Sequence, residues 1–234
     1  MIFKSLKAIT FAVGLAGLLA SPGAVQAQDP SVQATILYLY RMDSWATLPG
    51  RPDSTRRAAI QAVTEQNPKS QVQFFQDLRE DNKFIALIVG PDAQAKTSAG
   101  WSRNCFMETN SAVPARRCFV LNSTLLVGDP RLEFSGTSWI QIEHVDSDPM
   151  KRDANLPLFQ RLQTLMQRQP GFQGLQVWTW TARPNHWTVI TQWIDAEASR
   201  RAAADPEVMA TADQIYANEA APSNADVVRA IRSF

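Results

Sequence analysis

Two carboxylic acids and a cluster of tryptophans are the residues of this sequence whose types could do chemistry. The segment from Gln169 to Asp195 holds four of the seven tryptophans. Side chains of this size either fill a core or line a cavity that admits a flat ligand. Glu143 and Asp77 lie in strand-like segments beside large apolar residues. A carboxyl group buried in such a place has a raised pKa and can accept a proton from a phenol.

Strand alternation assigns the tryptophans to the faces of a predicted hairpin. Leu175–Thr181 and Trp187–Ile194 are strand-like and flank the turn-rich segment Ala182–Asn185. Successive side chains of a strand point to opposite faces. A hairpin loop with an even number of residues therefore places all four tryptophans on one face, and a loop with an odd number divides them between the two faces. We expect one shared face, turned away from the helices and into an interior that binds a ligand. The four residues are Trp178, Trp180, Trp187 and Trp193.

The second half of the chain has the pattern of one ferredoxin-like unit, with the order β-α-β-β-α-β. Ser138–Val145 alternates apolar and polar residues, as a strand does. An amphipathic helix follows, and Pro170-Gly171 ends it before the hairpin. Asp195 is then placed to cap a second helix that runs to about Ile215, and Asp226–Ser233 supplies a final strand.

The first half repeats this unit with a shift of 103 residues. The shift aligns Ile36–Leu39 with Trp139–Ile142, and Phe84 with Trp187. We therefore predict an α+β fold, in which two tandem ferredoxin-like units pack their antiparallel sheets into one α+β barrel. The correspondence places further candidate ligand-binding residues in the barrel interior, together with the carboxylates Glu143 and Asp77; the alternative is an interior filled by side chains, with the carboxylates at its rim. These candidates are Tyr38, Tyr40, Gln141, Phe75 and Phe84.

The N-terminus has the features of a secretory signal peptide. Lys4 and Lys7 precede the apolar run Ala8–Ala20, and small residues follow at Val25-Gln26-Ala27. The run is shorter than the roughly 20 apolar residues that a membrane-spanning helix needs. We expect cleavage near Ala27 and a secreted or periplasmic product. Residues 1–27 are then the signal peptide, 28–130 the first unit and 131–234 the second.

Cys105 and Cys118 are the only cysteines. In an exported protein they favour a disulfide, which would stabilise the fold by roughly 3 kcal/mol, with two free thiols as the alternative. The disulfide would hold the polar, turn-rich loop Gly100–Pro114, which shortens or replaces the second helix of the first unit.

Composition and motifs exclude several classes of function. A formal net charge of +1 indicates neither nucleic acid nor an anionic membrane as partner. The sequence lacks HExxH, CxxC and GxSxG patterns and a glycine-rich phosphate loop, so we expect no metal and no nucleotide. Glu143 and His144 are adjacent on a strand and point to opposite faces, which argues against a shared metal. His186 lies at the hairpin turn, where a solvated side chain is expected.

A family resemblance is carried by Gln169-Pro170-Gly171-Phe172, the hairpin, and then Gln192–Ala198. These residues resemble the PGF … W-x-(S/D)-x-E-A pattern of the antibiotic biosynthesis monooxygenase family of dimeric α+β barrel proteins. The resemblance covers about Thr137–Tyr216. It implies a barrel that two subunits normally form and that the two halves of this chain form here. The resulting pseudo-dimer is self-contained, so a monomer is allowed.

The resemblance also implies a range of functions, because the family includes cofactor-independent oxygenases of quinols and polyphenols as well as haem-degrading enzymes. Ala202 stands where many members have a histidine, and Gly90 replaces the motif tryptophan in the first unit. We therefore expect a barrel that binds a small aromatic or hydrophobic ligand without a cofactor and has lost its catalytic groups. The alternative is a cofactor-independent monooxygenase of a quinol or polyphenol, with Glu143 or Asp77 as the base.

Overall fold

The computed structural model describes residues 32–40, 54–80, 83–90, 100–102 and 117–231. The predicted signal peptide and Cys105 lie outside them, so signal cleavage and the disulfide stay predictions. In chain order the elements are β1 (Gln33–Tyr40), α1 (Ser54–Gln66), β2 (Gln71–Asp77), β3 (Lys83–Val89), β4 (Gly100–Ser102), β5 (Arg117–Gly128), β6 (Trp139–Ser147), a 3₁₀ turn (Pro149–Lys151), α2 (Arg152–Met166), β7 (Phe172–Trp180), β8 (Arg183–Trp193), α3 (Ala196–Ala203), α4 (Pro206–Tyr216) and β9 (Glu219–Ile231).

Eight of these strands close into an antiparallel barrel, as the sequence predicts. Their order is β1-β3-β2-β9-β6-β8-β7-β5, and β5 pairs back with β1. The short β4 adds to the other edge of β5. Two seams join the halves of the chain: β2 pairs with β9 from Phe74 to Asp77, and β5 pairs with β7 from Ser123 to Gly128. One chain thus builds the barrel from two ferredoxin-like sheets.

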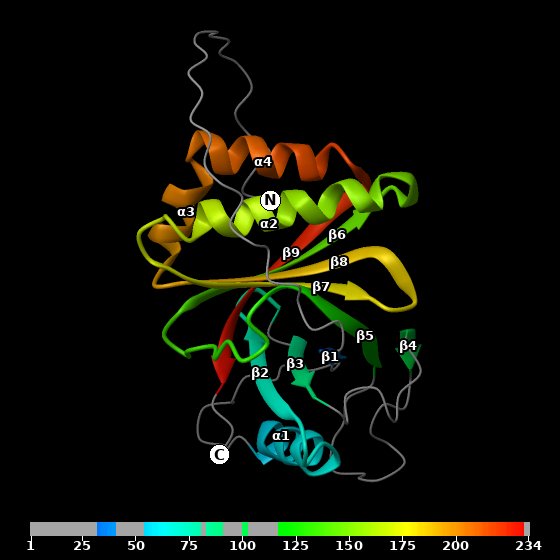
Figure 1. The fold of residues 1–234 in the computed structure, drawn as a ribbon. Coiled ribbons are helices and arrows are strands. Elements are labelled where there is room, and N and C mark those ends of the chain that lie inside the picture. The colour runs from blue at the N-terminus through cyan, green and yellow to red at the C-terminus, as the bar shows by residue number, and fades with distance from the viewer. Residues whose placement is uncertain (1–31, 41–53, 81–82, 91–99, 103–116, 232–234) are drawn as a thin grey trace, which may run out of the picture.

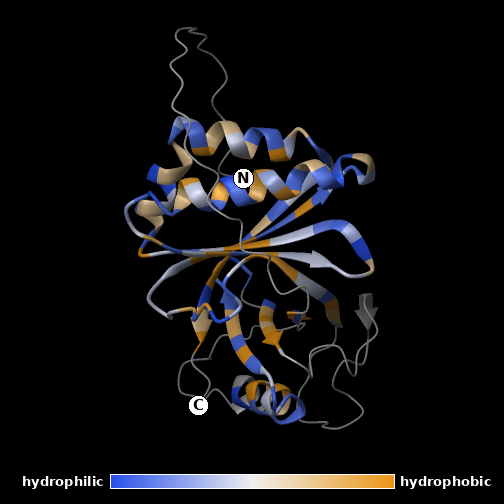
Figure 2. Cartoon of the chain, in the orientation of Figure 1, coloured by the Kyte–Doolittle hydropathy of each residue, from blue (hydrophilic) through white to orange (hydrophobic). Residues whose placement is uncertain are grey.

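Helices cover the barrel from two opposite sides (Figure 1). α1 lies over the sheet of the first half, and α2, α3 and α4 lie over the sheet of the second half. The helices mix hydrophilic and hydrophobic residues, and several barrel strands carry hydrophobic segments between paler or hydrophilic ones (Figure 2). Amphipathic helices of this kind bury one stripe against a sheet and leave the rest in water. The fold is therefore helix, barrel and helices in three layers.

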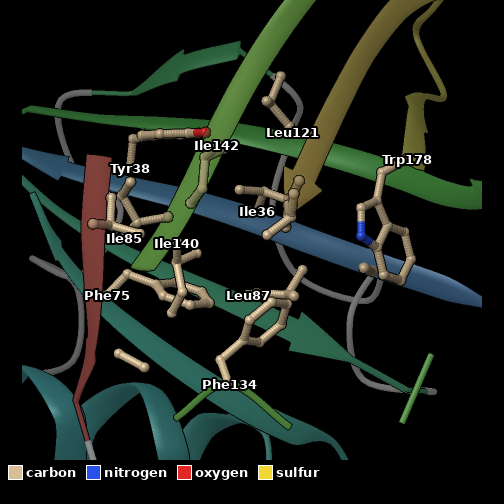
Figure 3. Packing of buried hydrophobic residues seen from close by; sticks show 14 of the residues in the cluster. Ile36, Tyr38, Phe75, Ile85, Leu87, Leu121, Phe134, Ile140, Ile142 and Trp178 are labelled. Atoms are coloured by element: carbon tan, nitrogen blue, oxygen red, sulfur yellow. The ribbon is translucent and has the colours of Figure 1, made fainter. Parts of the chain in front are cut away.

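The barrel interior is a core of its own, separate from the cores under the helices. Figure 3 shows side chains from both halves of the chain meeting inside the barrel, among them Ile36, Phe75, Ile142 and Trp178. The core under α1 contains Phe84, and it lies on the other side of the first sheet. The strands of the first sheet thus bury one face in the barrel and the other under α1.

The two halves are related by an approximate rotation about the barrel axis. Around the barrel, β5-β1-β3-β2 of the first half is followed in the same sense by β9-β6-β8-β7 of the second. Ile36 pairs with Leu87 and Leu121, and Ile142 pairs with Ile190 and Asp226. The registers of the β2–β3 and β7–β8 hairpins and of the two seams all match when Ile36 corresponds to Ile142. Because a rotation about the axis keeps each residue at its height, corresponding residues lie on opposite walls at one level.

The tryptophan hairpin differs from the expectation that all four side chains share a face. Trp178 pairs with Thr188, and Thr179 pairs with Trp187. An odd number of residues separates these partners, so the set is split. Trp178 and Trp180 belong to the barrel core, whereas Trp187 packs against Phe159 of α2. Trp193 also faces the helices, because it packs with Phe172 and with Ala198 and Ala202 of α3.

The helix that follows the hairpin begins as predicted but is broken in two. The carboxylate of Asp195 accepts a hydrogen bond of 2.7 Å from the backbone N–H of Ala198, which is an N-cap. α3 then ends at Ala203. Asp205 caps a new helix, α4, and Pro206 occupies its first turn, where the missing N–H costs nothing. The last strand, β9, begins at Glu219, earlier than the sequence pattern indicates.

Candidate functional site

A cavity of about 310 Å³ opens at one end of the barrel. It lies where β1 and β6 end and where β3, β5, β8 and β9 begin. We call it the mouth cavity. Its lining consists of Tyr38, Tyr40, Lys83, Phe119, His144, Asp146, His186, Ala221, Pro222 and Asn224. A pocket of this volume and largely aromatic lining suits a small ring compound.

The lining comes in corresponding pairs from the two halves. Tyr38 corresponds to His144, because each lies two residues after the matched isoleucine. Lys83 pairs with Tyr40 in the first half, and His186 pairs with Asp146 at the corresponding place in the second half, so Lys83 corresponds to His186 and Tyr40 to Asp146. Phe119 pairs with Tyr38 as Asn224 pairs with His144. The mouth cavity therefore lies on the barrel axis. The first half supplies phenol, phenyl and ammonium groups, and the second supplies imidazole, carboxylate and amide groups.

Tyr38 and His144 meet across the axis and form the floor of the mouth cavity. The Tyr38 hydroxyl lies 2.7 Å from Nε2 of His144, and Nδ1 of His144 lies 3.2 Å from the hydroxyl of Thr188. Burial is the main cause of a shift in the His144 pKa from 6.5 to about 3, and the neighbouring His186 and Lys83 lower it further. Burial and nearby carboxylates raise the pKa of Tyr38. Both side chains are therefore neutral near pH 7.

Three buried charged groups meet beside this floor, and we call them the charged pole: Asp77, Lys83 and Asp226. The ammonium of Lys83 donates a hydrogen bond of 2.5 Å to Asp226 and lies 3.8 Å from Asp77. The three residues are 2 to 4% exposed. Burial lowers the pKa of Lys83, but Asp226, with further contributions from Tyr40 and Asp77, outweighs it and the net shift is upward. The group therefore stays charged in the barrel, 5.4 Å from the ring centre of Tyr38.

The opposite wall is aromatic, and we call Phe119, Trp180 and His186 the aromatic pole. The rings of Trp180 and His186 are 5.6 Å apart, and those of Trp180 and Phe119 are 5.9 Å apart. Burial lowers the pKa of His186, and Asp146 partly offsets that shift. Within the described residues, Nε1 of Trp180 and Nδ1 of His186 are buried without a hydrogen-bond partner. Such atoms are places where a polar ligand group would be stabilised.

The structure brings together some of the predicted site residues. Tyr38 and Tyr40 line the mouth cavity, and Asp77 and Trp180 lie in the two poles beside it. Phe75 and Trp178 face the barrel interior but are fully buried in its core, below the cavity.

Five other predicted site residues point out of the barrel, so their assignment to its interior is wrong. The carboxylate of Glu143 accepts a hydrogen bond of 2.8 Å from Tyr216 of α4, and the amide oxygen of Gln141 accepts one of 2.7 Å from Ser199 of α3. Burial raises the pKa of Glu143, but the group faces a helix. The other three lie in the cores under the helices: Phe84, Trp187 and Trp193.

The sequence-based set lacks nine residues of the site: Lys83, Phe119, His144, Asp146, His186, Ala221, Pro222, Asn224 and Asp226. His144 has the parity of Ile140 and Ile142, so alternation within β6 could have placed it inside. His186 is not in a solvated turn, because β8 begins at Arg183 and the turn is shorter than predicted.

The described residues hold no group of three histidine, cysteine or acidic side chains placed to bind a metal ion. In the same part of the chain, no helix has the length and apolar character to cross a membrane.

Comparison with known proteins confirms the family resemblance. Residues 141–214 match the family model for antibiotic biosynthesis monooxygenase. No curated protein matches the chain in sequence. An anthrone oxidase-like protein is similar in structure, with a TM-score of 0.61 and 13% identity over 86% of this chain and 92% of that one.

Two further solved structures share the fold over most of both chains. A proposed monooxygenase from Fusobacterium nucleatum has a TM-score of 0.64 and 9% identity, covering 87% of this chain and 94% of that one. A ferredoxin-fold protein from Listeria monocytogenes, described as related to antibiotic biosynthesis monooxygenases, has a TM-score of 0.55 and 10% identity, covering 86% and 96%. At these identities the likeness shows the fold alone.

Proposed function

We propose that this protein binds a small aromatic ligand in the mouth cavity. The observation that carries the proposal is the cavity itself, which is about 310 Å³ in volume and is lined by three aromatic rings and two imidazoles. A flat ring would be sandwiched by these side chains, and its polar substituents would meet polar groups of the lining, such as the imidazole of His186 and the amide of Asn224.

We further propose that binding takes place outside the cytoplasm. The supporting observation is the signal peptide pattern at residues 1–27, with cleavage near Ala27. Mass determination of the N-terminus after expression with the full leader tests this proposal, because an uncleaved Met1 would contradict it.

A second candidate function is the cofactor-independent oxygenation of a quinol or polyphenol. The observation that favours it is a pair of imidazoles, His144 and His186, that line the cavity and have lowered pKa values. A neutral imidazole can accept the phenolic proton, and the resulting anion can donate electrons to O₂. In the balanced reaction a quinol and O₂ give a hydroxylated quinone and water, so no external reductant is consumed. His186 is the preferred base, because the nitrogen atoms of His144 contact Tyr38 and Thr188.

The test is calorimetric titration of the mature protein with hydroquinone and with a flavonol, with dissolved oxygen recorded in parallel. We expect saturable binding that His186→Ala weakens by on the order of tenfold, as loss of a stacking and hydrogen-bonding side chain does. Glu143→Gln is the matched control. It changes a carboxyl group that faces α4 rather than the cavity, so binding should be unchanged.

The outcomes separate the candidates. Binding without oxygen uptake indicates a binding protein. Binding with oxygen uptake that His186→Ala abolishes indicates an oxygenase. Binding that responds to Glu143→Gln and not to His186→Ala would refute the site assigned here.

A further inference from the structure

The charges at the mouth cavity do not balance. The charged pole contains one ammonium, on Lys83, and two carboxyl groups, on Asp77 and Asp226. With all three ionised, the charged pole has a net charge of −1. The ammonium lies closer to Asp226 than to Asp77, at 2.5 against 3.8 Å, so Asp226 offsets the positive charge that Lys83 presents to the cavity.

The other charged groups around the mouth cavity do not supply an available cation. Asp146 lines the cavity, and its carboxylate receives Nη2 of Arg183 at 3.0 Å on the solvent side. Arg79 is exposed, and its guanidinium donates to the backbone carbonyl of Ala225. Both imidazoles are neutral near pH 7. Among the described residues that face the cavity, each basic side chain is therefore already held by an acceptor.

We infer that the mouth cavity selects neutral aromatic ligands over carboxylated ones, and that Asp226 determines this selectivity by neutralising Lys83. The inference rests on the proposed function and names the ligand class of the same site. An anionic substituent would be desolvated beside a site with an excess of negative charge, and nothing there offsets that cost. A hydroxyl, amide or other neutral donor can instead hydrogen bond to Asp146, the carboxylate that lines the cavity.

The unlike walls also fix the orientation of such a ligand. Asp77 and Lys83 of the charged pole correspond to Trp180 and His186 of the aromatic pole, so the two poles face each other across the barrel axis. A ring that stacks on the aromatic pole extends its substituents toward the charged pole. We therefore expect the cavity to discriminate by the charge of the ring substituent that lies farthest from the aromatic pole.

The test compares two probes of the same shape and different charge, 2,5-dihydroxybenzamide and 2,5-dihydroxybenzoate. Affinities are measured by calorimetry at pH 7.5, and the readout is the ratio of the two dissociation constants. We expect the wild type to bind the benzamide tighter by on the order of tenfold or more. Asp226→Asn frees the charge of Lys83 and should bring the ratio down by on the order of tenfold.

Two further variants keep the test decisive. Asp77→Asn removes the more distant carboxylate and should lower the ratio less than Asp226→Asn, which gives a second reading if Asp226→Asn does not fold. Asp213→Asn removes an exposed carboxylate of α4 and should leave the ratio unchanged. Circular dichroism and a thermal melt establish that each variant is folded before its ratio is read.

Failure of the inference and failure of the proposed function have different signatures. Equal affinity for both probes in the wild type, or a ratio that neither aspartate variant changes, overturns the selectivity and leaves the proposed function in place. Absence of binding for both probes overturns the proposed function and the selectivity together.

Discussion

Protonation of His144 should destabilise the fold as the pH falls, and His144→Gln should remove that effect. The folded protein holds this imidazole neutral, with a pKa of about 3 against 6.5 for a free side chain. At every pH between these two values, the His144 side chain therefore binds more protons in the unfolded chain than in the folded protein. The free energy of unfolding falls as the pH drops from about 6.5 toward 3, and it does not depend on this group above about pH 7.5.

The size of the effect follows from the two pKa values. Each pH unit between them changes the free energy of unfolding by about 1.4 kcal/mol. Between pH 7 and pH 5 the wild type should therefore lose at most about 2 kcal/mol through His144. Urea unfolding followed by tryptophan fluorescence measures this loss, with circular dichroism recorded in parallel to establish that both probes report one transition.

The comparison between variants isolates His144 from the other groups that titrate in this range. Glu143 and Asp226 have raised pKa values, so they affect stability with the opposite sign, but they are present in both proteins. Tyr38→Phe is the matched control, since it removes the hydroxyl that contacts Nε2 and leaves the imidazole able to titrate. Equal losses of stability in the wild type and in His144→Gln between pH 7 and pH 5 would refute the assignment of a buried, neutral His144.

Three further changes test the fold at separate points. Trp178→Ala should lower the free energy of unfolding by about 3 to 5 kcal/mol in urea titrations, because the side chain is fully buried in the barrel core; a loss below 1 kcal/mol would be inconsistent with that burial. Asp195→Ala should cost about 1 kcal/mol, since it removes the N-cap of α3, and Asp195→Asn should recover most of the loss. Cys105→Ser should lower the melting temperature of the oxidised protein, as expected for loss of a disulfide worth roughly 3 kcal/mol, and an unchanged melting temperature would argue that Cys105 and Cys118 are not bonded.

The architecture could be predicted from the sequence because it depends on features that tolerate small errors of alignment. Segments that alternate apolar and polar residues, an amphipathic helix pattern and the capping residue Asp195 each indicate that a strand or helix is present. None of these signals specifies the exact residue register of that element. The repeat then indicates two like units, and two such sheets have one obvious way to cover each other. Even the correspondence of Phe84 with Trp187 holds, since both lie on the third strand of their unit and both face helices.

The site could not be predicted in the same way, because a face assignment changes with a shift of one residue. The uniform shift of 103 residues matches Tyr38 with Gln141, whereas strand pairing matches it with His144. That difference exchanges the two faces of β6 and carries Gln141 and Glu143 into the barrel in place of His144. The tryptophan hairpin fails for a related reason, since the parity of its loop depends on where the turn lies. The local sequence specifies neither the alignment of β6 with β1 nor the pairing of β7 with β8, because the closure of the whole barrel sets how the strands pair.

The position of the mouth cavity on the barrel axis explains what a tandem chain can do that a symmetric dimer cannot. In a barrel of two identical subunits, the wall opposite each lining residue carries the same residue. Lys83 would then face another lysine, and Tyr38 would face another tyrosine. Here the two walls are encoded separately, so Lys83 faces His186 and Tyr38 faces His144. An on-axis site with a charged pole and an aromatic pole therefore requires two unlike halves. The two halves differ at these lining positions, and this difference gives the cavity a direction in which an asymmetric ligand can bind.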